Sequence, residues 1–119
     1  MPDDAKSKLP FIDERTLTAN EEILLYVKSD STYGLRQPGN SGYVLNDGPG
    51  NLLVRSLDDN DKWSRDSTLE PGDQLLWEVG DDVDIVVVRI VADAAGAAYR
   101  SRFTRNVPYM KVQVITGAE

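Results

Sequence analysis

The chain contains no cysteine and no histidine. Without cysteine there is no disulfide framework, no thiolate nucleophile and no cysteine-based zinc or iron–sulfur site. Without histidine there is no imidazole to ligate a metal, to shuttle protons near neutral pH, or to complete a Ser-His or Cys-His catalytic pair. Catalysis would have to rely on carboxylates, lysine, tyrosine or a bound cation. We therefore expect a protein that is not an enzyme, with no catalytic residues, no metal site and no cofactor.

Long hydrophobic runs are also missing. The longest aliphatic block, residues 85–88, is too short to cross a bilayer and is followed by Arg89. The first residues, MPDDAKSKLPFIDE, are polar and mixed in charge, unlike the hydrophobic segment of a signal peptide. We therefore expect a protein made in the cytoplasm without a signal peptide, and no membrane partner. At 119 residues the chain fits one domain with a single core.

The charge of the chain is acidic and unevenly distributed. The net charge of −7 disfavours nucleic acid as a partner. Residues 56–84 hold ten acidic and two basic side chains, net −8, whereas residues 85–119 hold five basic and two acidic ones, net +3. Arg100, Arg102 and Arg105 form a basic stripe in the second segment. This stripe favours a carboxylate or protein partner, such as the acidic segment of another copy. Ordinary solvated surface is the alternative.

Turn-forming residues recur at short intervals and separate segments rich in β-branched and aromatic residues. This punctuation predicts an all-β fold, an antiparallel β-sandwich or β-barrel of roughly seven to nine strands. The strands are expected at residues 22–28, 42–46, 52–56, 62–68, 74–79, 83–91, 97–105 and 109–115. Residues 1–21 have few core candidates and are predicted to form an extended N-terminal arm, followed by one β-domain over residues 22–119. The alanine-rich residues 92–98 contain Gly96 and are predicted to form a turn or bulge between strands.

Alternation of apolar and polar residues distinguishes two kinds of strand. Residues 97–105 and 109–115 alternate, which is typical of half-buried strands. In the first, Ala97, Tyr99, Ser101 and Phe103 share one face. The segments EILLYVK and DIVVVRIV carry apolar residues on both faces, which predicts central or doubly covered strands.

The acidic loops suggest metal binding or catalysis, but turn chemistry explains them better. In SLDDNDKWS, Lys62 stands where a calcium loop would place a third oxygen ligand, and no closing glutamate follows. The acids Glu78, Asp81, Asp82 and Asp84 would offer carboxylates for glycoside hydrolysis, but nothing local indicates a protonated acid. Aspartate is a common turn residue.

The aromatic residues indicate both core and surface positions. Trp77 shares its parity with Leu75 and Val79, which favours core packing, whereas Trp63 lies in a charged strand and suits a surface or interface. Tyr33 and Tyr43 flank the loop YGLRQPGNSGY, whose glycines lack the spacing of a phosphate cradle. Tyr33, Tyr43 and Trp63 are the candidates for a sugar-stacking platform.

The segment PFIDERTLTANEE leading into ILLYVK, together with LEPGDQLLWEV, resembles in general character the small all-β structural proteins of tailed bacteriophage virions. These include capsid decoration (cement) proteins and fibre or connector subunits. The resemblance implies a virion protein that forms homo-oligomers, such as trimers, and stabilises a capsid or tail lattice. Interface candidates are Phe11, Trp63, Arg100, Arg102 and Arg105. Removing residues 1–15 is expected to weaken assembly and leave the domain folded.

Two other functions remain open at this point. One is a carbohydrate-binding module that uses the exposed aromatic residues. The other is an acidic inhibitor that mimics DNA through residues 58–84 and binds a basic target.

Overall fold

The computed structural model describes residues 10–29, 34–81 and 83–106, and these residues contain eight β-strands. The strands are β1 (Phe11–Leu17), β2 (Glu22–Tyr26), β3 (Ser41–Pro49), β4 (Leu52–Leu57), β5 (Ser67–Leu69), β6 (Gln74–Trp77), β7 (Val87–Ala92) and β8 (Ala97–Thr104). One turn of 3-10 helix, η1 (Val79–Asp81), follows β6, and those ranges contain no α-helix. The predicted all-β class is confirmed, and the strand count lies within the expected range.

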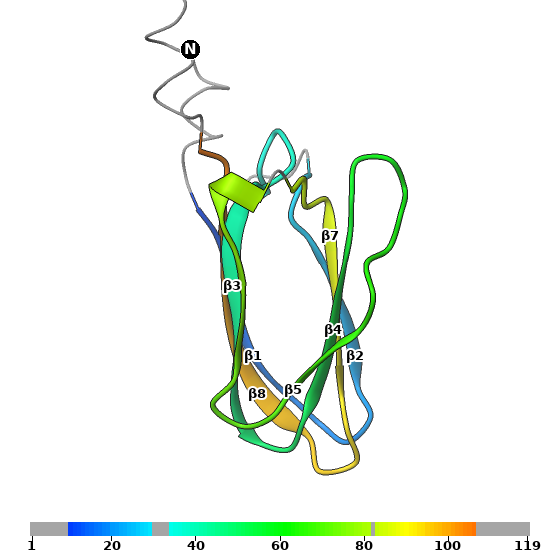
Figure 1. Ribbon diagram of the computed structural model, residues 1–119. Coiled ribbons are helices and arrows are strands. Elements are labelled where there is room, and N and C mark those ends of the chain that lie inside the picture. The colour runs from blue at the N-terminus through cyan, green and yellow to red at the C-terminus, as the bar shows by residue number, and fades with distance from the viewer. Residues whose placement is uncertain (1–9, 30–33, 82, 107–119) are drawn as a thin grey trace, which may run out of the picture.

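The strands form two antiparallel sheets that lie face to face (Figure 1). Sheet A has the order β1-β8-β3-β6, and sheet B has the order β2-β7-β4-β5. Each sheet therefore keeps two edge strands, so the fold is a sandwich rather than a closed barrel. The outer face of each sheet points away from the core, and these two outer faces lie on opposite sides of the molecule.

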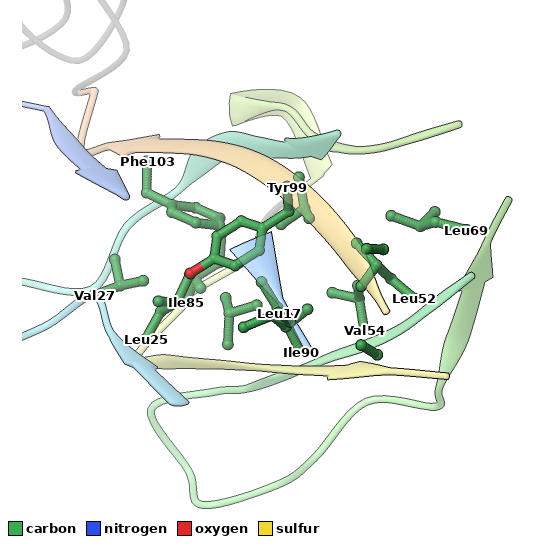
Figure 2. Close-up of a cluster of buried hydrophobic side chains, with 14 of the residues drawn as sticks. Leu17, Leu25, Val27, Leu52, Val54, Leu69, Ile85, Ile90, Tyr99 and Phe103 are labelled. Atoms are coloured by element: carbon green, nitrogen blue, oxygen red, sulfur yellow. The ribbon is translucent and has the colours of Figure 1, made fainter. Parts of the chain in front are cut away.

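The core lies between the sheets and is built from the inward positions of the strands (Figure 2). In β8 the predicted alternation is confirmed, because Ala97, Tyr99, Ser101 and Phe103 are buried. β7 is a central strand, as its apolar pattern predicted, with Val88 and Ile90 fully buried. Complete burial of an aliphatic side chain contributes about 1.5–3 kcal/mol each, which makes this strand a main source of stability.

Gly42 gives room to an aromatic row across the inner face of sheet A. It pairs with Trp77 on one side and Phe103 on the other. The Phe103 ring lies 5.5 Å from that of Trp77 and 6.4 Å from that of Phe11. A Cβ at position 42 would overlap the Phe103 ring and the Arg102 carbonyl oxygen. The predicted core position of Trp77 is confirmed, and Phe11 contributes to the same cluster.

Asn46 is a fully buried polar residue at the irregularity in the β3–β8 register. Its Nδ2 donates to the carbonyl oxygens of Gly50 and Leu69, at 2.9 and 2.8 Å, and its Oδ1 accepts from the Gly48 N–H at 2.7 Å. These bonds satisfy the amide and connect the β3–β4 turn to β5. A polar side chain therefore fixes the end of the core where strand alternation is interrupted.

At the same end of the sandwich, Asp93 connects three turns. Its side chain accepts hydrogen bonds from the backbone N–H groups of Asn51 and Ala95, and its carbonyl oxygen accepts one from Asn20. The turn at residues 93–96 was predicted, and Gly96 occupies the left-handed region there, with φ of 72°. A Cβ on Gly96 would also approach the Leu17 carbonyl oxygen, so glycine is required at this position.

The boundary between arm and domain differs from the prediction. Residues 11–17 were assigned to the arm, but they form β1, which pairs with β8 from Phe11↔Phe103 to Leu17↔Ala97. Leu17 is buried in the core. The sequence did not reveal this strand because Asp13 and Arg15 are polar, although they share the inward-facing side of β1 with Phe11 and Leu17.

Two other strand predictions need correction, and one lies outside the described residues. EILLYVK was expected to be central or covered on both sides, but β2 is an edge strand with Leu24 and Tyr26 exposed. The strand expected at 62–68 is shorter, since β5 is Ser67–Leu69, and Trp63 contributes only an isolated bridge to Leu57. The strand expected at 109–115 lies outside the described residues.

Candidate interaction surfaces

The outer face of sheet B carries an exposed apolar surface. Six large hydrophobic side chains are exposed among the residues that the structure describes. Four of them, 38–57% exposed, gather on this face, and we call them the sheet B face: Leu24, Tyr26, Leu53 and Trp63. Soluble proteins seldom expose large apolar side chains together unless the surface has a partner.

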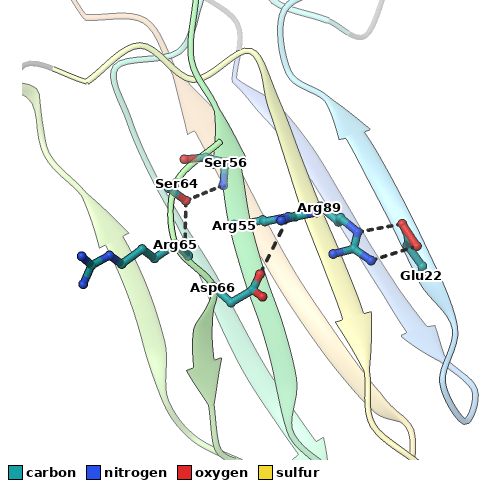
Figure 3. A network of polar contacts seen from close by, with 7 residues as sticks. All are labelled: Glu22, Arg55, Ser56, Ser64, Arg65, Asp66 and Arg89. Carbon is teal, nitrogen blue, oxygen red and sulfur yellow. Dashed lines mark hydrogen bonds and ion pairs between the residues drawn. The ribbon is translucent and has the colours of Figure 1, made fainter. Parts of the chain in front are cut away.

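Charged groups on the sheet B face are paired with one another (Figure 3). Arg89 Nε and Nη2 donate to the two carboxylate oxygens of Glu22 at 2.7 and 3.2 Å. Arg55 Nε lies 3.8 Å from Asp66 Oδ1. The contact with Arg89 lowers the pKa of Glu22 below its ordinary value, and Glu22 raises that of Arg89. The arginines extend along the sheet between apolar residues, so their stems add to the apolar surface.

Trp63 is exposed, as the sequence predicted. Its ring lies under the Arg55 guanidinium, whose Cζ is 4.9 Å from the ring centroid, a cation–π arrangement. Beside it lies a pocket of about 310 Å³, also lined by Asp58, Asp59 and Asp84. Because Arg55 covers one side of the indole, less of the ring is left for stacking on a sugar.

The three arginines of the predicted stripe have different environments. Arg100 makes two bonds of 2.9 Å to the carboxylate of Asp47, which raises the Arg100 pKa. Arg105 pairs with Asp84 at 3.0 Å, so the basic and acidic segments meet within one chain. Arg102 has no ion-pair partner in the described part of the chain. Of the three, Arg102 is therefore the one available to a ligand or partner.

The remaining aromatic candidates do not form one platform. Tyr43 lies half-buried on the outer face of sheet A, beside Arg102 in the β3–β8 register. Trp63 belongs to the opposite face, and Tyr33 lies outside the described residues. Phe11 packs on Phe103, so part of its ring serves the core, and its role at an interface stays a prediction.

The acidic residues serve turns and ion pairs. Asp58 Oδ1 accepts from the backbone N–H groups of Asn60 and Lys62, and Asp81 Oδ2 accepts from that of Glu78. These contacts agree with the turn interpretation. Asp82 lies outside the described residues, which contain no group of three or more acids suited to a metal ion.

The DNA-mimic hypothesis needs a continuous display of unpaired carboxylates. Three acids of residues 58–84 instead pair with cations, since Asp59 lies 3.6 Å from Lys28 Nζ and Asp66 and Asp84 bind arginines. This pairing leaves the hypothesis with less support than it had from composition.

Sequence patterns missed Leu24, Tyr26 and Leu53 as surface residues. For Leu24 and Tyr26 the apolar residues on both strand parities were a signal, but they were interpreted as burial under a second layer; no such prediction was made for Leu53. The described residues include no helix long and apolar enough to span a membrane. Comparison with family models, curated proteins and solved structures finds no match.

Proposed function

We propose that this protein is a non-enzymatic assembly protein whose copies associate through the sheet B face. One observation carries the proposal: among the residues that the structure describes, four of the six exposed large hydrophobic side chains lie on this face. Burying them against another protein would remove apolar surface from water, the main favourable contribution to protein association.

The composition of the face supports a protein partner rather than a small ligand. Tyr26, Trp63 and Arg55 belong to the residue types that are enriched at protein interfaces. The face extends across β2, β7 and β4, so the apolar residues form a broad surface. Because Arg89 and Arg55 already have carboxylates beside them, their burial leaves no isolated charge.

The resemblance to bacteriophage virion proteins suggests where such an assembly would occur. Under this proposal the protein is a virion component, such as a capsid decoration protein, that binds copies of itself and stabilises a capsid or tail lattice. The N-terminal arm and the arginines of the basic stripe, including Arg102, would then make secondary contacts.

The test compares matched double variants of the full chain. Leu24→Glu with Leu53→Glu places two charges on the sheet B face, and Ile12→Glu with Leu76→Glu places two on the outer face of sheet A. The molar mass of each is measured by light scattering after size exclusion, across a wide range of concentrations. We expect the wild type and the sheet A variant to exceed the mass of one chain, and the sheet B variant to equal it. A wild type that stays monomeric at every concentration contradicts the proposal.

A further inference from the structure

A groove of about 510 Å³ opens on the outer face of sheet A, at the end where β6 leads into η1. Its sides come from three strands, β6, β3 and β8, and from the residues that follow β6 and β8. We propose that this groove binds an uncharged oligosaccharide of two or three pyranose rings. The inference goes beyond the proposed assembly function and uses the opposite face of the molecule.

The centre of the groove offers an apolar surface suited to a sugar ring. Tyr43 on β3 pairs with Leu76 on β6, which is 50% exposed, and both side chains are directed to the outer face. A pyranose has an apolar face of C–H groups that packs against an aromatic ring, while its hydroxyls remain at the rim. The rim of this groove is correspondingly polar.

Three polar side chains on one side of the groove are held in a fixed arrangement. Ser41 Oγ and Thr104 Oγ1 are 2.7 Å apart, and Asn106 Nδ2 donates to them at 3.0 and 3.1 Å. Asn106 is itself held by Asn40, whose Oδ1 accepts from the Asn106 backbone N–H at 2.8 Å and whose Nδ2 donates to the Asn106 carbonyl oxygen. The cluster is thus organised before any ligand arrives, which lowers the entropic cost of binding.

A count of hydrogens shows what this cluster offers to a ligand. Ser41 and Thr104 have one hydroxyl hydrogen each, and only one of them is used in the bond between the two oxygens. Asn106 Nδ2 donates to lone pairs of the two hydroxyl oxygens, so its bonds use neither of the hydroxyl hydrogens. One hydroxyl donor therefore remains, next to Asn106 Oδ1, an acceptor without a bond among the described residues. A donor beside an acceptor matches the paired hydroxyls of a sugar, each of which both donates and accepts.

Arg102 and Glu78 supply further polar groups on the two sides of Tyr43. Neither has an ion-pair partner in the described part of the chain, and both line the groove. Arg102 lies on β8 and Glu78 follows β6, and these strands are two strand spacings apart, about 10 Å. Two or three linked rings laid across β8, β3 and β6 would reach both side chains. The guanidinium would donate to hydroxyls at one end, and the carboxylate would accept from hydroxyls at the other.

The charges favour an uncharged saccharide over an acidic one. Arg102 shares the groove with the carboxylate of Glu78, so the groove does not concentrate positive charge. The whole chain carries a net charge of −7, which repels a polyanion at long range. Hydroxyl groups, by contrast, use both the donors and the acceptors present.

The test titrates the isotope-labelled full chain with maltotriose, cellotriose and tri-N-acetylchitotriose, and with trigalacturonate as the acidic arm. Binding is followed by the backbone amide NMR signals. We expect at least one neutral trisaccharide to shift the signals of Tyr43, Leu76 and Thr104, and those of Leu24 and Leu53 on the opposite sheet to stay in place.

Matched variants then assign the binding to individual groups. Arg102→Ala should weaken binding by about tenfold or more, as expected when a charged hydrogen-bond donor is lost. Arg100→Ala, on the same strand face but outside the groove, should leave affinity unchanged. Thr104→Val, which removes only the hydroxyl, should also weaken binding. If no neutral probe shifts the groove signals, if only trigalacturonate binds, or if binding survives both Arg102→Ala and Thr104→Val, the proposal is overturned.

Discussion

Asp93 Oδ2 accepts a hydrogen bond of 2.9 Å from the backbone N–H of Asn51, which joins the β7–β8 turn to the β3–β4 turn. The same carboxylate accepts a second bond of 2.9 Å from Ala95 through Oδ1. Ala95 lies two residues from Asp93, whereas Asn51 is distant along the chain, and strand alternation does not reveal the contact with Asn51. The contact joins two of the turns at one end of the sandwich, where the chain crosses from one sheet to the other.

Replacing this carboxylate should make stability less sensitive to acid. The backbone bonds from Asn51 and Ala95 lower the pKa of Asp93 below its ordinary value of 3.8. A lowered folded-state pKa contributes stability above the unfolded value, and this contribution is lost as the pH falls through the folded-state pKa. Asp93→Asn should therefore melt below the wild type at neutral pH, with a smaller difference below about pH 4. Thermal denaturation across pH measures this, and a constant difference would contradict it.

Tyr99 should contribute to stability through its hydroxyl. The group donates a bond of 2.6 Å to Asp13 Oδ1, and the side chain is buried. Tyr99→Phe should lower the free energy of unfolding by about 1–2 kcal/mol in urea titrations. Tyr26→Phe, on an exposed ring, is the control and should have little effect.

The same variant should differ from the wild type in its response to base. Burial, followed by the bond to Asp13, raises the pKa of Tyr99 above its ordinary value of 10.0. A raised pKa contributes stability below the unfolded value that is lost as the pH rises. The advantage of the wild type over Tyr99→Phe should thus shrink above about pH 10. An advantage that grows with pH would contradict this, because it would mean that the pKa of Tyr99 is lower in the folded than in the unfolded chain.

Asn46 should be among the most costly polar residues to replace. Asn46→Leu would leave the Gly48 N–H and the Gly50 and Leu69 carbonyl oxygens without their bonds inside the core. We expect a loss of about 2–5 kcal/mol in unfolding free energy from the unpaired groups. Asn60→Leu, in an exposed turn, provides the matched change. Equal effects of the two variants in chemical denaturation would refute the structural role of Asn46.

Two N-terminal deletions separate the arm from the domain. Removing residues 1–15 deletes most of β1, including Phe11 and the Asp13 that binds Tyr99. This deletion should destabilise the domain, contrary to the expectation from sequence that it stays folded. Removing residues 1–9 leaves β1 complete and should preserve the melting temperature. Circular dichroism melts of both shortened chains measure the difference, and two unchanged melts would show that β1 is dispensable.

The sequence was sufficient for the fold class because period-2 alternation and turn residues are local signals. β8 and β7 were predicted with their correct environments for this reason. β1 was missed because Asp13 and Arg15 interrupt its apolar pattern. As an edge strand it pairs with β8 alone, so it does not need a continuous apolar run. β2 was predicted as buried because Leu24 and Tyr26 are apolar on its outer side, and composition does not distinguish an inner layer from an exposed face.

The interaction surfaces were only partly predictable. Trp63 was correctly expected at the surface because charged neighbours surround it in sequence. The grouping of Tyr43 with Thr104 and Asn106 depends on pairing between β3 and β8, which are distant along the chain. The ion pair between Arg105 and Asp84 likewise could not be predicted without the fold, because charge counts along the chain place the two residues in separate patches.

Under the two proposals, one molecule would bind a partner through the sheet B face and a saccharide through the groove on the opposite side. A copy anchored to a lattice through sheet B would hold its groove outward, and occupying one face would not obstruct the other. Many copies on one particle would repeat the groove at the lattice spacing. A polysaccharide that engages several grooves would then gain about 10²–10⁴ in overall affinity without any new contact. Weak binding by a single groove would be sufficient for firm attachment of the whole array.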